Sequence, residues 1–236
     1  MRILKMLLGS ATIALASAVA LHAETPKDTV VMAKALDDMI SLDPGEAFEF
    51  SGGEVIGNMY ERLVYYDLKN VSNIYGALAE SWSVANDGKT YTFKLRPGIK
   101  FSSGNPVTAA DVVYSIQRAV TLNKAPGFIL TQFGINKDNA SQRVRAADPM
   151  TVVMETEKTV APTFFYYCLT AGVGSVIDSV VAKQHEANGD FGNEWLKQHS
   201  AGTGPYMLRA WKANESYILD ANPNYHGKAP LTPHVF

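Results

Sequence analysis

The chain has 236 residues, of which 47% are hydrophobic and 19% charged, a composition typical of a folded globular protein rather than a disordered one. Its 21 Lys and Arg residues against 23 Asp and Glu residues give a formal net charge of -2, so no basic excess is present for binding a nucleic-acid backbone. The single cysteine, Cys168, excludes an internal disulfide and a cysteine-rich metal cluster.

The first residues follow the pattern of a secretory signal peptide. Arg2 and Lys5 precede an apolar run, and small residues follow this run up to Ala20 and Ala23. The apolar run is shorter than the ~20 residues that a membrane span requires, which makes an uncleaved anchor the less favoured alternative. We therefore predict that residues 1–23 are a signal peptide, cleaved after Ala20 or Ala23, and that the protein is exported.

The mature chain begins with a strand pattern followed by a helix pattern. Residues 29–33 are apolar and rich in valine, which predicts a short buried strand. In residues 51–63 the apolar side chains recur at helical spacing, which predicts a helix, and residues 65–68 read as a brief strand. Residues 90–95 alternate aromatic or aliphatic with polar side chains, the pattern of a half-buried antiparallel strand.

The clearest helix signal lies in the middle of the chain. Thr108 and Asp111 stand at the spacing of a capping box, and an apolar stripe follows them. Residues 121–149 contain Pro, Gly and several Asn, which predicts long loops around short helical pieces. The remaining expected elements are a strand at 151–155, helices at 161–169, 179–186 and 193–199, and a hairpin of 206–211 with 217–221.

The mature sequence carries no recognisable catalytic or metal-binding motif. Gly88-Lys89-Thr90 resembles the end of a phosphate-binding loop, but Ser83 stands where that motif requires a glycine, so a hairpin turn explains it better. Cys168 sits in an apolar aromatic run typical of a protein core. The four histidines of the mature chain do not form a zinc pair at helical spacing. We predict no catalytic residue, no metal site and no cofactor, and we do not expect an enzyme.

Several segments are similar to one known family, the family 5 extracellular solute-binding proteins. These are the dipeptide-, oligopeptide- and nickel-binding components of ABC importers. The similarity is carried by GNMYERLVYYD at 57–67, LAESW at 78–82, DGKTYTFKLR at 87–96, ADVVYS at 110–115, GTGPY at 202–206 and LDANPNY at 219–225. Together these segments cover most of the mature chain, and the block from 78 to 115 is the most specific of them.

The resemblance implies an α/β fold, the N-terminal lobe of a periplasmic-binding-protein-like architecture (type II, cluster C) with an inserted α+β subdomain. It implies a core made of residues 24–59 and 172–236, with the subdomain at 60–171. Members of the family are longer and continue into a second lobe, so we expect the chain to be C-terminally truncated and that lobe to be missing. The missing part would include the acidic residue that meets the free amino group of a peptide.

The resemblance also implies a function and its partners. We expect a periplasmic protein, a monomer, that captures a peptide or a related small solute and delivers it to an inner-membrane ABC permease. In such proteins the ligand favours a closed arrangement of two lobes because it touches both lobes only when they are closed.

The resemblance suggests two groups of ligand-contacting residues. Asp38, Met39 and Ile40 follow the first predicted strand, where family members line the ligand; alternatively, Met39 and Ile40 are core residues and Asp38 belongs to a turn. Phe133 and Gly134 form a second candidate group, for which a structural role is the competing interpretation.

Two other functions remain open at this point. An exported hydrolase acting on peptides or cell-wall fragments would need a nucleophile with a base, or a metal triad, and neither pattern is recognisable. A non-transport interaction module is the third possibility, and the absence of a second lobe would favour it.

Overall fold

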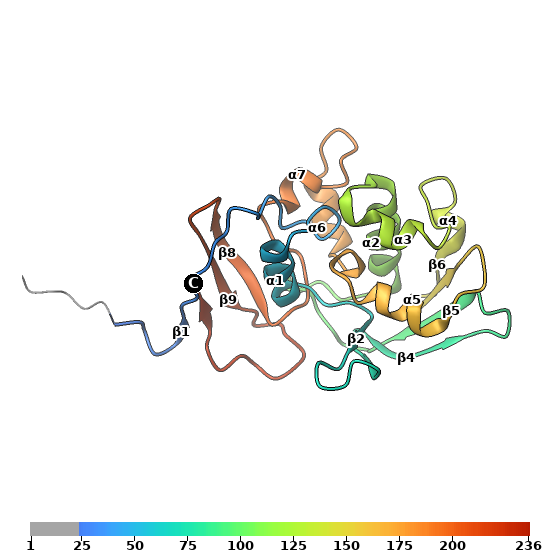
Figure 1. Ribbon diagram of the computed structural model, residues 1–236, viewed down its shortest axis with the longest axis horizontal. Coiled ribbons are helices and arrows are strands. Elements are labelled where there is room, and N and C mark those ends of the chain that lie inside the picture. The colour runs from blue at the N-terminus through green and yellow to red at the C-terminus, as the bar shows by residue number, and fades with distance from the viewer. Residues whose placement is uncertain (1–23) are drawn as a thin grey trace, which may run out of the picture.

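The computed structural model describes residues 24–236 (Figure 1), so the predicted signal peptide lies outside the described residues. The strands are β1 (Thr29–Val30), β2 (Val64–Tyr66), β3 (Ile74–Gly76), β4 (Ala79–Val84), β5 (Thr90–Leu95), β6 (Val144–Asp148), β7 (Thr151–Glu155), β8 (Tyr206–Lys212), β9 (Ser216–Ala221) and β10 (His234–Val235). The helices are α1 (Phe50–Met59), α2 (Ala109–Leu122), α3 (Phe128–Thr131), α4 (Ala140–Arg143), α5 (Pro162–Leu169), α6 (Ser179–Gln184) and α7 (Asn193–Leu196), with 3-10 turns η1 (Ala125–Gly127) and η2 (Gly172–Gly174).

The middle of the chain builds an antiparallel sheet in the order β4-β5-β7-β6, covered by helices (Figure 1). The alternation of β5 buries Tyr91 and Phe93 completely, and both rings lie within 6.2 Å of the ring of Tyr166 on α5. Helix α2 packs against β6 and begins with the predicted capping box, in which Thr108 N donates to Asp111 Oδ2 at 2.9 Å.

A second sheet joins the two ends of the described chain. Its order is β1-β10-β9-β8, with β1 parallel to β10 and the other pairs antiparallel. Helix α1 lies against β8, at the left of Figure 1. A separate two-stranded hairpin of β2 and β3 follows α1.

The buried apolar side chains form two clusters. The larger cluster runs from Leu63 to Val176 and fills the space between the β4–β7 sheet and its helices. The other cluster combines Met39 to Tyr60 with Ile177 to Leu219, from α1 and the second sheet. The assignment of 24–59 with 172–236 to a lobe core, and of 60–171 to an inserted subdomain, stays a prediction.

Polar contacts fasten the two clusters together along α2. Asp111 Oδ1 accepts hydrogen bonds from the backbone N and the Oγ of Ser179, at 3.1 and 2.6 Å. Asp178 caps α6 with one carboxylate oxygen and accepts from Ser103 Oγ and Asn105 Nδ2 with the other, at 2.6 and 2.9 Å. Each carboxylate accepts two or more hydrogen bonds. A buried carboxylate without donors would cost free energy, so these contacts favour one specific packing of the two clusters.

Two glycines let the main chain cross itself beside this joint. A Cβ at Gly202 would lie 2.2 Å from Met59 O, and one at Gly204 would lie 2.5 Å from Asn58 O. The close approach allows Gly204 N to donate to Met59 O at 2.9 Å. The GTG sequence at 202–204 is therefore explained by its close contact with the end of α1.

The structure confirms most of the expected elements and corrects several boundaries. The strands at 90–95 and 151–155, the helix after Thr108 and the 206–221 hairpin are present. The first strand is only two residues long and is not buried as predicted, because Val30 is 39% exposed. Helix α1 ends at Met59 rather than continuing to Leu63. Tyr60 is extended and fully buried in the same cluster as α1, and the chain then reaches the larger cluster at Leu63.

Candidate functional site

The loop before α1 is held in place by two acidic side chains. Glu49 Oε1 accepts from Ile40 N at 3.1 Å, and its Oε2 accepts from Phe48 N at 2.8 Å. Asp38 Oδ2 accepts from Ser51 N at 3.2 Å, one of the backbone donors that the first turn of a helix leaves without an intrahelical partner. These hydrogen bonds from Ser51 lower the pKa of the Asp38 carboxyl. The loop therefore has a defined backbone although its outer side faces solvent.

This loop exposes apolar side chains next to α3. The exposed fractions are 68% for Ile40, 57% for Phe48 and 96% for Phe50. Phe128 on α3 is 55% exposed, and its ring meets the ring of Phe48 edge to face, with centroids 5.6 Å apart. We call these four side chains the exposed apolar surface. Because Phe48 and Phe128 are in contact, and Ile40 and Phe50 are exposed on the same fixed segment as Phe48, the surface has the properties of a contact site for an apolar or amphipathic partner.

The inner side of the same loop carries a buried ion pair. Asp43 and Arg118 are 0% and 2% exposed, and the carboxylate takes two hydrogen bonds from the guanidinium, the longer at 2.8 Å. Arg118 Nε also donates to Phe191 O at 2.8 Å, and Asn193 Nδ2 donates to Asp43 Oδ2 at 2.5 Å. Burial alone would lower the pKa of Arg118, but the hydrogen bonds and the charge of Asp43 raise it. The network ties the loop to α2 and to the start of α7.

The predicted residues 38–40 divide between the core and the surface. Met39 is 3% exposed and belongs to the cluster around α1, whereas Asp38 and Ile40 are exposed. Met39 and Ile40 line one pocket of about 410 Å³ together with Trp211, whose Nε1 is buried without a hydrogen-bond partner among residues 24–236. A part for these residues in ligand binding stays a prediction.

The second predicted group lies elsewhere. Phe133 is 4% exposed and packs against Phe165, with centroids 5.0 Å apart. Gly134 has a φ of +76°, and a Cβ there would lie 2.4 Å from Glu157 Cβ, so both the turn and the packing require glycine. Phe133 lines a different pocket of about 270 Å³, which shares no residue with the pocket at Met39 and Ile40. A role in ligand binding for Phe133 and Gly134 likewise stays a prediction.

The sequence did not predict the phenylalanines of the exposed apolar surface. Phe48 and Phe50 stand outside the buried stripe of α1, which consists of Val55, Ile56 and Met59. The available signal for a contact surface was a pair of phenylalanines on either side of Glu49, just before a predicted helix. Sequence alone, however, does not separate an exposed phenylalanine from a buried one.

The described residues show little that suggests metal or acid–base chemistry. Within residues 24–236, no group of three or more His, Cys, Asp or Glu side chains is arranged to hold a metal ion. Burial raises the pKa of the Cys168 thiol, which keeps it protonated and poorly nucleophilic, and the hydrogen bond that it accepts comes from Gln132 Nε2 at 3.7 Å. Every helix in residues 24–236 falls short of the length and apolarity needed to cross a bilayer.

The profile of the bacterial extracellular solute-binding proteins, family 5 (middle), matches residues 73–235. This chain belongs to that family. Its similarity to the probable D,D-dipeptide-binding periplasmic protein DdpA of Escherichia coli K12 is 34% identity over 212 residues, covering 89% of this chain and 39% of that protein. The periplasmic murein peptide-binding protein MppA of the same organism is 31% identical, over 88% of this chain and 40% of its own length.

Solved structures of family members have the same fold. The solute-binding protein MoaA of Agrobacterium tumefaciens R10, in complex with mannopinic acid, superposes with a TM-score of 0.74 at 27% identity, covering 88% of this chain and 40% of that chain. Unliganded, open MppA gives a TM-score of 0.73 at 26% identity, over 89% and 41% of the two chains. These likenesses confirm the predicted α/β, periplasmic-binding-protein-like fold. The chain spans about 40% of the length of the relatives that it matches.

Proposed function

We propose that this protein is the substrate-binding component of an ABC importer, which captures a peptide or a related small solute in the periplasm and delivers it to an inner-membrane permease. The observation that carries the proposal is the exposed apolar surface, where aromatic side chains from two parts of the chain meet on a backbone fixed by Asp38 and Glu49. Family members are named for binding D,D-dipeptides, murein peptides and oligopeptides, which supports a peptide cargo.

The chemistry of the surface suits a cargo that varies. Rings that make apolar contact impose few directional demands, so side chains of different shape can be accommodated. Phe48 lies before α1 and Phe128 lies on α3, and their rings are in contact, so a ligand placed across them would contact both parts of the chain. Binding without catalysis fits the protonated state favoured for Cys168. We expect the protein to act as a monomer.

The proposal is tested by titrating di- and oligopeptides into the full chain and measuring heat of binding and melting temperature. Binding to the folded state raises the melting temperature by mass action. Phe48→Ala and Phe128→Ala each remove a large contact, and we expect each to weaken peptide binding by about tenfold or more. Leu68→Ala is the control, because Leu68 is 85% exposed on the turn between β2 and β3, outside the exposed apolar surface.

Three results would count against the proposal. The first is a peptide affinity that both phenylalanine variants leave unchanged. The second is the absence of binding by any peptide or small solute. The third is hydrolysis of the peptides by the purified protein, which would favour the exported hydrolase instead.

A further inference from the structure

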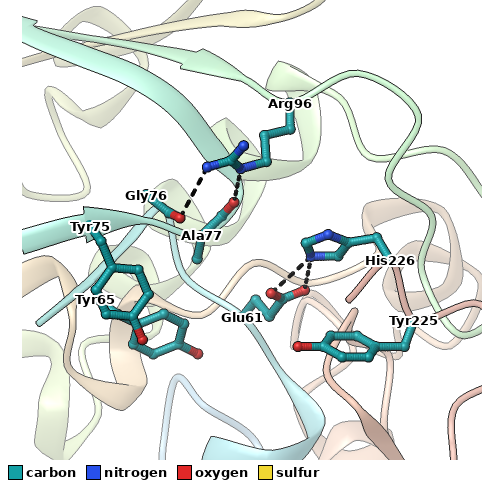
Figure 2. Close-up of a pocket in the computed structure, with 8 residues that line it drawn as sticks. All are labelled: Glu61, Tyr65, Tyr75, Gly76, Ala77, Arg96, Tyr225 and His226. Carbon is teal, nitrogen blue, oxygen red and sulfur yellow. Dashed lines mark hydrogen bonds and ion pairs between the residues drawn. The ribbon is translucent and has the colours of Figure 1, made fainter. Parts of the chain in front are cut away.

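A pocket of about 340 Å³ lies where the end of α1, the β2–β3 hairpin and the segment after β9 meet (Figure 2). Its walls carry one carboxylate, Glu61, and one guanidinium, Arg96, together with His226 and three tyrosines, Tyr65, Tyr75 and Tyr225. None of these residues belongs to the exposed apolar surface.

The carboxylate of Glu61 is buried in the wall with few partners. Its side chain is 9% exposed, and both of its oxygens share one donor, His226 Nε2, at 3.0 and 3.1 Å. A carboxylate offers about four acceptor positions, so capacity remains for a further donor. Tyr225 lines the same pocket, and burial together with the negative charge of Glu61 raises the pKa of its hydroxyl.

The guanidinium of Arg96 is oriented by the main chain rather than by an acidic group. Nε donates to Ala77 O at 2.8 Å, and Nη2 donates to Gly76 O at 3.3 Å. Within residues 24–236, no carboxylate lies within ion-pair distance of Arg96. Glu61 pairs with His226 instead. The pocket therefore holds two opposite charges that do not neutralise each other directly, and each keeps hydrogen-bonding capacity.

The tyrosines supply the rest of the wall. Figure 2 shows Arg96 at the top of the labelled set, Tyr75 and Tyr65 at the left and Tyr225 at the lower right, with Glu61 between the two groups of rings. Tyr65 and Tyr75 lie on paired strands with ring centroids 6.0 Å apart, and Arg62 Nη1 fixes Tyr65 by a hydrogen bond of 2.9 Å to its hydroxyl. These rings form an apolar surface beside the charged groups.

We propose that this pocket is a second binding site, which takes a free α-amino acid with an aromatic or apolar side chain. The α-carboxylate pairs with Arg96, the α-ammonium group pairs with Glu61, and the side chain lies among the tyrosine rings. A zwitterion complements both charges at once, whereas a simple cation or anion would satisfy one and oppose the other. The carboxylate, the guanidinium and the tyrosine rings also match an α-amino acid, whose α-carbon carries an ammonium group, a carboxylate and a side chain.

The inference is tested by calorimetric titration of the full chain with L-phenylalanine, N-acetyl-L-phenylalanine and L-phenylalaninamide. Each derivative lacks one of the two charges, so we expect each to bind at least about tenfold more weakly than L-phenylalanine, as the loss of a charge-assisted hydrogen bond requires. Arg96→Gln and Glu61→Gln should weaken L-phenylalanine binding by a similar factor. Arg145→Gln is the matched control, because Arg145 is a surface residue on β6.

Tyr75→Leu keeps the inference testable if the Glu61 variant does not fold. Tyr75 is 48% exposed on a short strand, so its replacement should leave folding intact while removing one ring from the site. Loss of L-phenylalanine binding in this variant supports the site. Peptide binding measured on the same variants is expected to persist, because Phe48 and Phe128 do not line the pocket.

Three outcomes would overturn the inference. One is no binding of L-phenylalanine up to about 10 mM, a concentration that detects even a weak site. Another is equal affinity for the derivatives that lack a charge. The third is L-phenylalanine binding that depends on Phe48 but not on Arg96, which would place the amino acid on the exposed apolar surface.

Discussion

The loop before α1 has an inner and an outer side that are built in opposite ways. On the inner side, Asp43 and Arg118 are buried and joined by two hydrogen bonds, with Asn193 as a further donor to Asp43. On the outer side, Phe48 and Phe50 are largely exposed, and the ring of Phe48 packs against the ring of Phe128. The comparison indicates that buried polar contacts behind a loop can fix the backbone that carries an exposed contact site.

The largest expected effect is on the inner side. Arg118→Ala leaves the Asp43 carboxylate buried without its cation, and we expect it to lower the free energy of unfolding by about 3–5 kcal/mol. Chemical denaturation measures this change. Arg145→Ala is the control, since its ion pair with Glu155 is exposed and should contribute about 0–1 kcal/mol. Equal effects of the two substitutions would remove the distinction between a buried anchor and a surface pair.

A smaller loss is expected from Asn193→Ala. The asparagine is 3% exposed and donates to both Asp43 and Glu46, so its removal leaves the buried carboxylate with one donor group fewer. We expect a destabilisation of about 1–3 kcal/mol, measured by denaturant titration. Asn73→Ala is the comparison, because Asn73 is exposed at the turn between β2 and β3 and does not have a positive φ. A neutral result for Asn193→Ala would mean that Arg118 alone holds the loop.

Acidification should affect the outer side before it affects global unfolding. The pKa of Asp38 is lower in the folded protein than its ordinary value, so its contribution to stability is present above that value and is lost as the pH falls below about 4. We expect lower protection of Ser51 N in acid, measured as its exchange rate relative to the intrinsic rate at the same pH, and the same loss of protection in Asp38→Asn at neutral pH. Protection of Ser51 N that stays constant between neutral pH and acid would contradict the capping role of Asp38.

The smallest expected effect on stability comes from Phe50. Because its side chain is 96% exposed, Phe50→Ser should change the free energy of unfolding by no more than about 0.5 kcal/mol. Thermal melting in the absence of ligand measures this difference. Val55→Ser, on the buried face of the same helix, provides the contrast, and comparable losses in both variants would show that Phe50 contributes to the fold.

Sequence reasoning succeeded where a local pattern determines the structure. The alternation of Thr90–Leu95 and the capping box at Thr108 are visible without knowledge of tertiary contacts. It failed where strands lack an apolar face: β6, which is exposed at every position after Val144, lies in the stretch predicted as loops and short helices, and β3 was not predicted. Both strands form because a neighbouring strand pairs with them, which a single-sequence pattern does not record.

The candidate site was less predictable for a similar reason. The segment at Asp38, Met39 and Ile40 alternates between solvent and core within three residues, which depends on the backbone bonds to Glu49 and Ser51. The edge-to-face contact joins Phe48 to Phe128, which lies 80 positions further along the chain. Spacing along the chain predicts neither relation, because each arises from tertiary folding.

The glycine crossing at Gly202 and Gly204 has a consequence for how the molecule tolerates change. The carbonyl groups of Asn58 and Met59 occupy the space that a methyl group would need, so even alanine would wedge the two main-chain segments apart. Met59, Tyr60 and Ala201 belong to the same buried cluster, so the added methyl group would disturb the packing of that cluster directly. We therefore expect alanine at either position to move the end of α1 away from the segment that leads into β8.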